Sequence, residues 1–200
     1  MPTNKTHTIT GTGASMVVAA ALQLPIIPMV IGAVAGSVIP DIDSEKSVIN
    51  SKILIFKKRT ALKITYSIIG LAAIIYGSIS LKLMGIFLVL AAISGHRKFT
   101  HSFLGFLSFC SICLYVLYSY SGIIRHMVFG LIIGYGTHIL ADSFSNHGIE
   151  LLWPMYEKNY GFRLIRTGKM SEHIFLVISS ILMYILFNRF FKTAGKIVWF

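Results

Sequence analysis

The feature that most constrains this chain is the length of its uncharged segments. Between Lys5 and Asp41 there are 35 consecutive residues without Asp, Glu, Lys or Arg, and similar runs hold 18 residues after Lys63 and 23 after His101. A helix needs about 20 apolar residues, within a range of roughly 17–25, to cross the hydrocarbon core of a bilayer. Hydrophobic residues make up 55% of the chain and charged residues only 12%, whereas a soluble domain carries about 25% charged residues. The chain is therefore predicted to be an integral membrane protein, neither soluble nor disordered.

Helix-breaking residues divide these segments. Pro25 and Pro28 interrupt the longest run, and Lys82 and Arg125 each follow a short stretch containing Gly and Ser. Proline inside a helix removes a hydrogen bond and clashes with the preceding turn. We therefore expect an all-α, polytopic membrane helix bundle of three helical hairpins plus a C-terminal helix, in a single integral membrane domain over residues 1–200. The expected helices cover residues 9–23 and 28–39, 61–79 and 83–95, 102–120 and 126–141, and about 173–190.

Two details of this bundle remain open at this point. Gly32 and Gly36, like Gly130 and Gly134, have the four-residue spacing that lets membrane helices pack closely, but chance placement in a chain with 17 glycines explains the spacing equally well. The last expected helix contains an uncharged run of only 15 residues, from after His173 to before Arg189. It either crosses the bilayer or lies in its interface.

The polar residues at the ends of the apolar runs point to function, because an ionisable residue at membrane depth is costly. His138 and Asp142 are four residues apart, so they share one helix face. Each hairpin begins and ends on the same side of the bundle. The chain's three aspartates and four of its seven histidines are therefore expected together on one face: His7, Asp41, Asp43, His96, His101, His138 and Asp142.

Four imidazoles and three carboxylates suit one or two divalent transition metal ions. Nitrogen and oxygen ligands without thiolates fit Zn²⁺ best, with Mn²⁺ or Fe²⁺ as alternatives. Two such ions about 4 Å apart would activate water and hold a phosphoester in line for attack. Each histidine taken alone is better explained by helix capping or a helix–helix hydrogen bond, and Asp41 and Asp43 alone could cap the next segment. The joint placement of all seven favours a metal site.

At these same residues the chain resembles a known family, the YdjM-like, LexA-regulated, membrane-bound metal-dependent hydrolases. The matching stretches occur in the family's order across residues 6–154. Two positions, Lys98 within the third stretch and His147 directly before the last, differ from the family pattern, which has smaller or neutral residues there. The order of ligands is also similar, more loosely, to that of zinc-dependent phospholipase C-type enzymes. The stretches are Thr6-His7, Gly36 to Asp43 (GSVIPDID), His96 to Ser102 (HRKFTHS), Gly134 to Phe144 (GYGTHILADSF) and Gly148 to Pro154 (GIELLWP).

The resemblance implies a membrane-embedded metal-dependent hydrolase acting on a phosphoester or lipid. We expect all seven clustered residues to be metal ligands, and Asp43, His101 and Asp142 also to be catalytic. Arg97 and Lys98 lie between two of the proposed ligands. They are expected either to hold a phosphate or anionic headgroup or to anchor the protein at the membrane surface. His147 and His173 are further ligand candidates on the same face.

The distribution of basic residues predicts the orientation in the membrane. Of the 18 Lys and Arg residues, 13 lie on the motif face and 5 on the other face if the last helix spans. Cytoplasmic loops carry the excess of basic residues, so we expect the cell (inner) membrane with the motif face in the cytoplasm. Membrane lipid is the expected partner. Nucleic acid is not, because the net charge of +11 is spread over a mostly apolar chain that lacks a charged soluble face.

Two other classes of function remain as alternatives. A metal or ion transporter would need polar residues distributed through the depth of the bilayer, whereas these cluster at one end. A structural or regulatory membrane protein would use the His/Asp cluster only to tie helices together. The sequence does not name the substrate, the number of metal ions or the oligomeric state.

Overall fold

The computed structural model describes residues 2–45, 47, 49–53 and 58–194, and helices dominate this part of the chain. It confirms the all-α fold class, with seven α-helices and only isolated β-bridges in the described residues. The α-helices are α1 (Asn4–Leu22), α2 (Ile26–Gly36), α3 (Arg59–Tyr76), α4 (Ile79–Ser94), α5 (Phe103–Ser119), α6 (Ile123–Ser143) and α7 (Met170–Ala194). Short turns of other helix types are η1 (Pro40–Asp43), η2 (Ile49–Ile53) and η3 (Phe99–His101).

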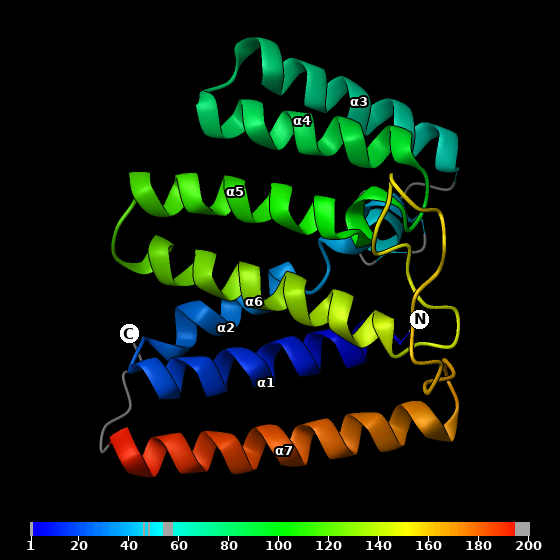
Figure 1. Ribbon diagram of the computed structural model, residues 1–200. Coiled ribbons are helices and arrows are strands. Elements are labelled where there is room, and N and C mark those ends of the chain that lie inside the picture. Colours follow the sequence, from blue (N-terminus) through cyan, green and yellow to red (C-terminus); the bar gives the residue numbers. More distant parts are fainter. Residues whose placement is uncertain (1, 46, 48, 54–57, 195–200) are drawn as a thin grey trace.

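The helices lie side by side with roughly parallel axes, and the short hairpin turns gather at one end of the bundle (Figure 1). The N-terminus, η1, η3 and the loop that follows α6 lie at the other end (Figure 1). The hairpin α3–α4 and the single helix α7 lie at opposite edges of the bundle (Figure 1). Of the other helices, α7 packs mainly against α1. Among the described residues, four segments are long and apolar enough to cross a membrane: Ile26–Asp43, Arg59–Tyr76, Ile123–Ser143 and Met170–Thr193.

The helix boundaries differ from expectation at three places. α1 begins at Asn4 instead of residue 9, so His7 lies inside the helix, where it and its polar neighbours face the protein interior. Pro28 falls in the first turn of α2, where a proline removes no intrahelical hydrogen bond; the break itself lies at Gln23, which has a left-handed backbone. α7 is 25 residues long, which gives it the length to span the bilayer.

The glycine spacing proves to be a packing device between α2 and α6. A Cβ atom added at Gly32 would collide with the backbone carbonyl of Met127, and one added at Gly130 would collide with that of Met29. Gly36 and Gly134 meet the facing helix backbone in the same way. The spacing is therefore required for close approach of the two helices, and this pair has the most extensive contact among the helices.

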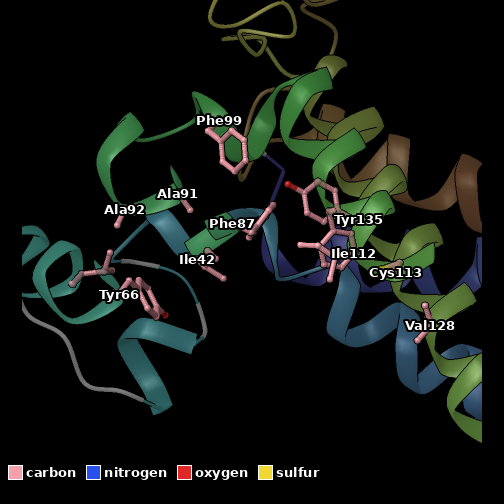
Figure 2. Close-up of a cluster of buried hydrophobic side chains, with 12 residues drawn as sticks. Ile42, Tyr66, Phe87, Ala91, Ala92, Phe99, Ile112, Cys113, Val128 and Tyr135 are labelled. Atoms are coloured by element: carbon pink, nitrogen blue, oxygen red, sulfur yellow. The ribbon is translucent and has the colours of Figure 1, made fainter. Parts of the chain in front are cut away.

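A cluster of aromatic side chains fills the centre of the bundle beneath the motif face. Phe87 of α4 lies between Phe99 of η3 and Tyr135 of α6 (Figure 2), with ring centroids 5.3 Å and 6.5 Å away. Phe109 of α5 stacks on Tyr135 at 4.7 Å. The hydroxyl of Tyr135 donates a 2.6 Å hydrogen bond to the carbonyl of Thr100. This contact ties the core directly to the η3 turn, which carries His101.

We expect Gly130→Ala to destabilise the bundle and Gly136→Ala to leave it intact or slightly more stable. Both glycines lie in α6, but a Cβ at Gly136 meets only the Phe106 ring at 3.5 Å. Overpacking typically costs about 1–3 kcal/mol, whereas Ala is favoured over Gly by about 1 kcal/mol in a helix. Thermal unfolding in detergent checks this. Equal midpoints for the two variants would contradict the close contact of α2 with α6.

Candidate metal centre

Five of the seven expected ligands meet at the motif end of the bundle. α1 carries His7 in its first turns, and α6 carries the pair His138 and Asp142 near its C-terminal end. Asp41 lies in η1, which follows α2, and His101 ends η3, which precedes α5. The long-range convergence arises because each of these elements ends or begins on the same face. All five side chains are buried, with at most 8% of a residue exposed.

The carboxylate of Asp142 is the centre of this cluster. Its Oδ2 lies 3.3 Å from Nε2 of His101 and 3.7 Å from Nε2 of His138. Its Oδ1 lies 3.3 Å from Nε2 of His7. Asp41 approaches from the other side, with Oδ1 3.6 Å from Nε2 of His101 and 3.9 Å from Nε2 of His138. The imidazoles and carboxylates thus point their ligand atoms at a shared space.

Most of these atoms have no hydrogen-bond partner in spite of their proximity. Both ring nitrogens of His7, both oxygens of Asp142 and Oδ1 of Asp41 are buried and unsatisfied. A buried polar atom without a hydrogen-bond partner is costly, and four of these atoms, Nε2 of His7, both oxygens of Asp142 and Oδ1 of Asp41, face the cluster. The ligand atoms form two triads, and within each triad the three atoms lie within 4.8 Å of one another. The triads are His7–His138–Asp142 and Asp41–His101–His138. Nitrogen and oxygen donors in this arrangement fit a divalent transition metal.

Two of the histidines are oriented by their other ring nitrogen. Nδ1 of His138 lies 2.7 Å from the carbonyl of Ser37, so it carries the proton and turns Nε2 toward the cluster. Nδ1 of His101 lies 3.0 Å from the hydroxyl of Thr100. Burial lowers the pKa of His101, but the adjacent carboxylates of Asp142 and Asp41, 3.3 Å and 3.6 Å from Nε2, outweigh it and raise that pKa to about 10. In the metal-free protein, these carboxylates hold a proton on the ring that a cation would replace.

The other two expected ligands, Asp43 and His96, form a separate pair beside the cluster. Nδ1 of His96 lies 3.1 Å from Oδ1 of Asp43. Oδ2 of Asp43 accepts hydrogen bonds from the backbone N–H of Arg97 at 2.7 Å and the hydroxyl of Thr100 at 3.3 Å. Among the described residues, neither Asp43 nor His96 belongs to the two ligand triads. His96 is 35% exposed in its side chain while Asp43 is buried.

The expected substrate residues occupy two different environments. Arg97 lines a groove of about 590 Å³ that also reaches Asp41, His96 and His147. Its backbone has a φ of 63°, a conformation rare for a residue with a side chain. Lys98 instead lies 2.8 Å from Glu157 and 4.0 Å from Glu150, and the hydrogen bond to Glu157 raises the pKa of Lys98. The groove therefore presents the guanidinium of Arg97 and two imidazoles beside the cluster.

The last of the expected ligand candidates, His173, lies outside the cluster's two ligand triads. His173 lies at the start of α7 in a separate groove of about 750 Å³. No role is expected from the sequence for the supporting partners Ser37 and Thr100, although both lie inside the matching stretches GSVIPDID and HRKFTHS. Lys46, Lys57 and Lys196, which entered the count of basic residues, lie outside the described residues.

Comparison with known proteins identifies the family of the chain. The profile of the YdjM inner membrane protein family matches residues 1–200. The chain belongs to this family. It is also similar to the "Uncharacterized protein YvsG" of Bacillus subtilis (strain 168), with 26% identity over 174 residues that cover 87% of each chain. No solved structure matches. Family membership and the four apolar spans together identify an inner membrane protein.

We expect Asp43→Asn to destabilise the metal-free protein by about 1.5–3 kcal/mol. That is the usual contribution of hydrogen bonds to a charged group, and the Asp43 carboxylate holds the strained Arg97 backbone in place. The measurement is thermal unfolding in the presence of a chelator. Glu45→Gln, which removes the same charge two residues away, serves as the control and is expected to change stability little. Equal effects would show that Asp43 does not support the turn.

Proposed function

We propose that this protein is a membrane-embedded, metal-dependent hydrolase that acts on a phosphoester at the membrane interface. The observation that carries the proposal is the convergence of five buried His and Asp side chains, whose ligand atoms form two triads. Their carboxylate oxygens and imidazole nitrogens approach one another to 3.3–3.9 Å, yet both oxygens of Asp142 and Oδ1 of Asp41 form no hydrogen bond. Membership of the YdjM family supports the proposal through the shared order of its His and Asp motifs.

The two ligand triads would hold one or two ions, with Zn²⁺ expected first and Mn²⁺ or Fe²⁺ as alternatives. When bound, such an ion supplies a Lewis acid that lowers the pKa of water and stabilises charge on a phosphoryl oxygen. His7, His101 and His138 provide nitrogen ligands. Asp41 and Asp142 provide the negative charge that neutralises the cation in a buried site.

The pair Asp43–His96 is placed to handle protons at the mouth of the site. Asp43 binds Nδ1 of His96, which leaves Nε2 available on a partly exposed ring. A histidine held by a carboxylate in this way can donate a proton to a leaving group. We propose that His96 performs this transfer and that Asp43 orients it.

The groove beside Asp41 is proposed as the substrate site. Arg97 and the imidazoles of His96 and His147 line it, and a guanidinium binds phosphate oxygens in a bidentate manner. The site lies at the end of apolar spans, so the phosphate of a membrane lipid can reach it from the interface. The 13 basic residues expected on this face support a cytoplasmic orientation.

A structural role is the second candidate, favoured by one observation. The cluster links four elements that are far apart in sequence, α1, η1, η3 and α6, and such a link would stabilise the bundle without any ion. A transporter is less well supported, because the clustered ligands lie together at one end of the bundle.

We expect purified wild-type protein to contain one or two equivalents of Zn, Mn or Fe, and the variant His138→Ala/Asp142→Ala to contain none, because both triads lose ligands. Elemental analysis after reconstitution checks this. His126→Ala is the control, since it removes a histidine from the opposite end of the same helix. A folded wild type that binds no metal would overturn the hydrolase proposal and favour the structural role.

We expect Arg97→Gln to raise KM about 10- to 100-fold with kcat and metal content nearly unchanged, since a charged contact to substrate contributes about 1.5–3 kcal/mol. The probes are phosphatidylglycerol in mixed micelles and bis(p-nitrophenyl) phosphate. An effect on both indicates phosphate recognition, and an effect on the lipid alone indicates headgroup recognition. Lys98→Gln is the control, because Glu157 already engages that ammonium. An unchanged KM for Arg97→Gln contradicts the proposed groove.

A further inference from the structure

His7 differs from the other two histidines of the cluster in how it is held. His138 and His101 each have a ring nitrogen fixed by an oxygen, from Ser37 and Thr100 respectively. Neither ring nitrogen of His7 has a hydrogen-bond partner. Besides the 3.3 Å contact of its Nε2 with Oδ1 of Asp142, the His7 ring stacks on that of His138, with centroids 3.7 Å apart and planes 12° apart. The position of His7 therefore depends on the backbone at the start of α1.

That backbone is held from the other end of the sequence by Glu172. One carboxylate oxygen, Oε1, accepts hydrogen bonds from the backbone N–H of Thr3 and, at 2.7 Å, from the hydroxyl of Thr6. The other oxygen, Oε2, accepts a 2.7 Å hydrogen bond from the N–H of Gly168. Thr6 directly precedes His7, whose own N–H donates to the carbonyl of Thr3 at 3.1 Å. Glu172 thus binds Thr3 and Thr6, the first residue of the turn that ends at His7 and the residue directly before His7.

The partners of Glu172 indicate more than helix capping. A carboxylate in the first turn of a helix interacts favourably with the helix dipole, and an exposed position suffices for that. Glu172 instead is only 4% exposed, is the only acidic residue in α7, and directs one oxygen entirely to α1. Burying a carboxylate is costly unless it is fully hydrogen-bonded, and here both oxygens are engaged across two elements.

We propose that Glu172 is a positioning residue that holds His7 in the metal centre, so that the docking of α7 on α1 completes the ligand set. The part of the proposal that concerns metal affinity rests on the proposed metal-dependent function. The part that concerns the placement of the His7 ring does not, because the hydrogen bonds of Glu172 are made to the chain itself.

The placement of His7 is tested first in metal-free protein. Ring-proton NMR of histidine-labelled protein, with the His7 signal identified by its loss in His7→Ala, reports the stacking on His138. We expect Glu172→Ala to move this signal toward the position of an unstacked histidine and Glu172→Gln to move it less, since the amide keeps one acceptor oxygen. Glu157→Ala, which removes an exposed carboxylate from the neighbouring loop, is expected to leave it unchanged. A His7 signal unaffected in folded Glu172→Ala and Glu172→Gln would overturn the proposal.

Metal affinity is tested next by a double-mutant cycle, using Zn²⁺ titration with a competing chelator. We expect Glu172→Ala to weaken Zn²⁺ binding about 10- to 100-fold, as is usual for the loss of a residue that supports a ligand. In a His7→Ala background, the same substitution should cost little more, because its effect acts through His7. Additive losses would show a general structural role and contradict the proposal. If wild type binds no Zn²⁺, the metal function fails, whereas the NMR result still decides the placement of His7.

Discussion

The close contact between the backbones of α2 and α6 is the interaction on which the rest of this structure depends. Glycines on both helices allow this contact. It fixes the register in which the C-terminal end of α2 lies against α6. Because of this register, the carbonyl of Ser37 at the end of α2 meets Nδ1 of His138 on α6. The same register brings Asp41, four residues after Ser37, to 3.9 Å from the other ring nitrogen of His138, Nε2. A side chain at Gly32 or Gly130 would separate these partners and open the site.

The second constraint is electrostatic. Two carboxylates and three imidazoles are buried together at the end of apolar helices, where an uncompensated charge is costly. Supporting hydrogen bonds orient His101 and His138, whereas the carboxylate oxygens that face the centre lack partners. Two of the imidazoles are thus oriented by outer hydrogen bonds, while the inner ring nitrogens of all three and the carboxylates face one another at 3.3–3.9 Å. Tyr135, which lies in the aromatic cluster (Figure 2), donates a hydrogen bond to the carbonyl of Thr100, the residue before His101 in the η3 turn.

Two parts of the bundle outside the His/Asp cluster contact the residues around it. The turn held by Asp43 exposes Arg97 to the groove next to Asp41, and α7 holds the start of α1 through Glu172. Helix α7 packs mainly against α1 among the helices. Its position at one edge, remote from α3 and α4 (Figure 1), is explained if its task is to support the helix that carries His7.

The sequence by itself determined the fold class, the hairpins and the motif face, because uncharged runs of spanning length and their breaks are local properties of the chain. It also singled out His7, Asp41, His101, His138 and Asp142, since ionisable residues stand out in an apolar sequence. Only the tertiary structure separated the pair Asp43–His96 from that cluster, engaged Lys98 with glutamates and assigned a role to Glu172. These outcomes depend on distances between atoms that lie up to 169 residues apart in the chain. No local pattern encodes such distances, because they are set by how closely the helices pack.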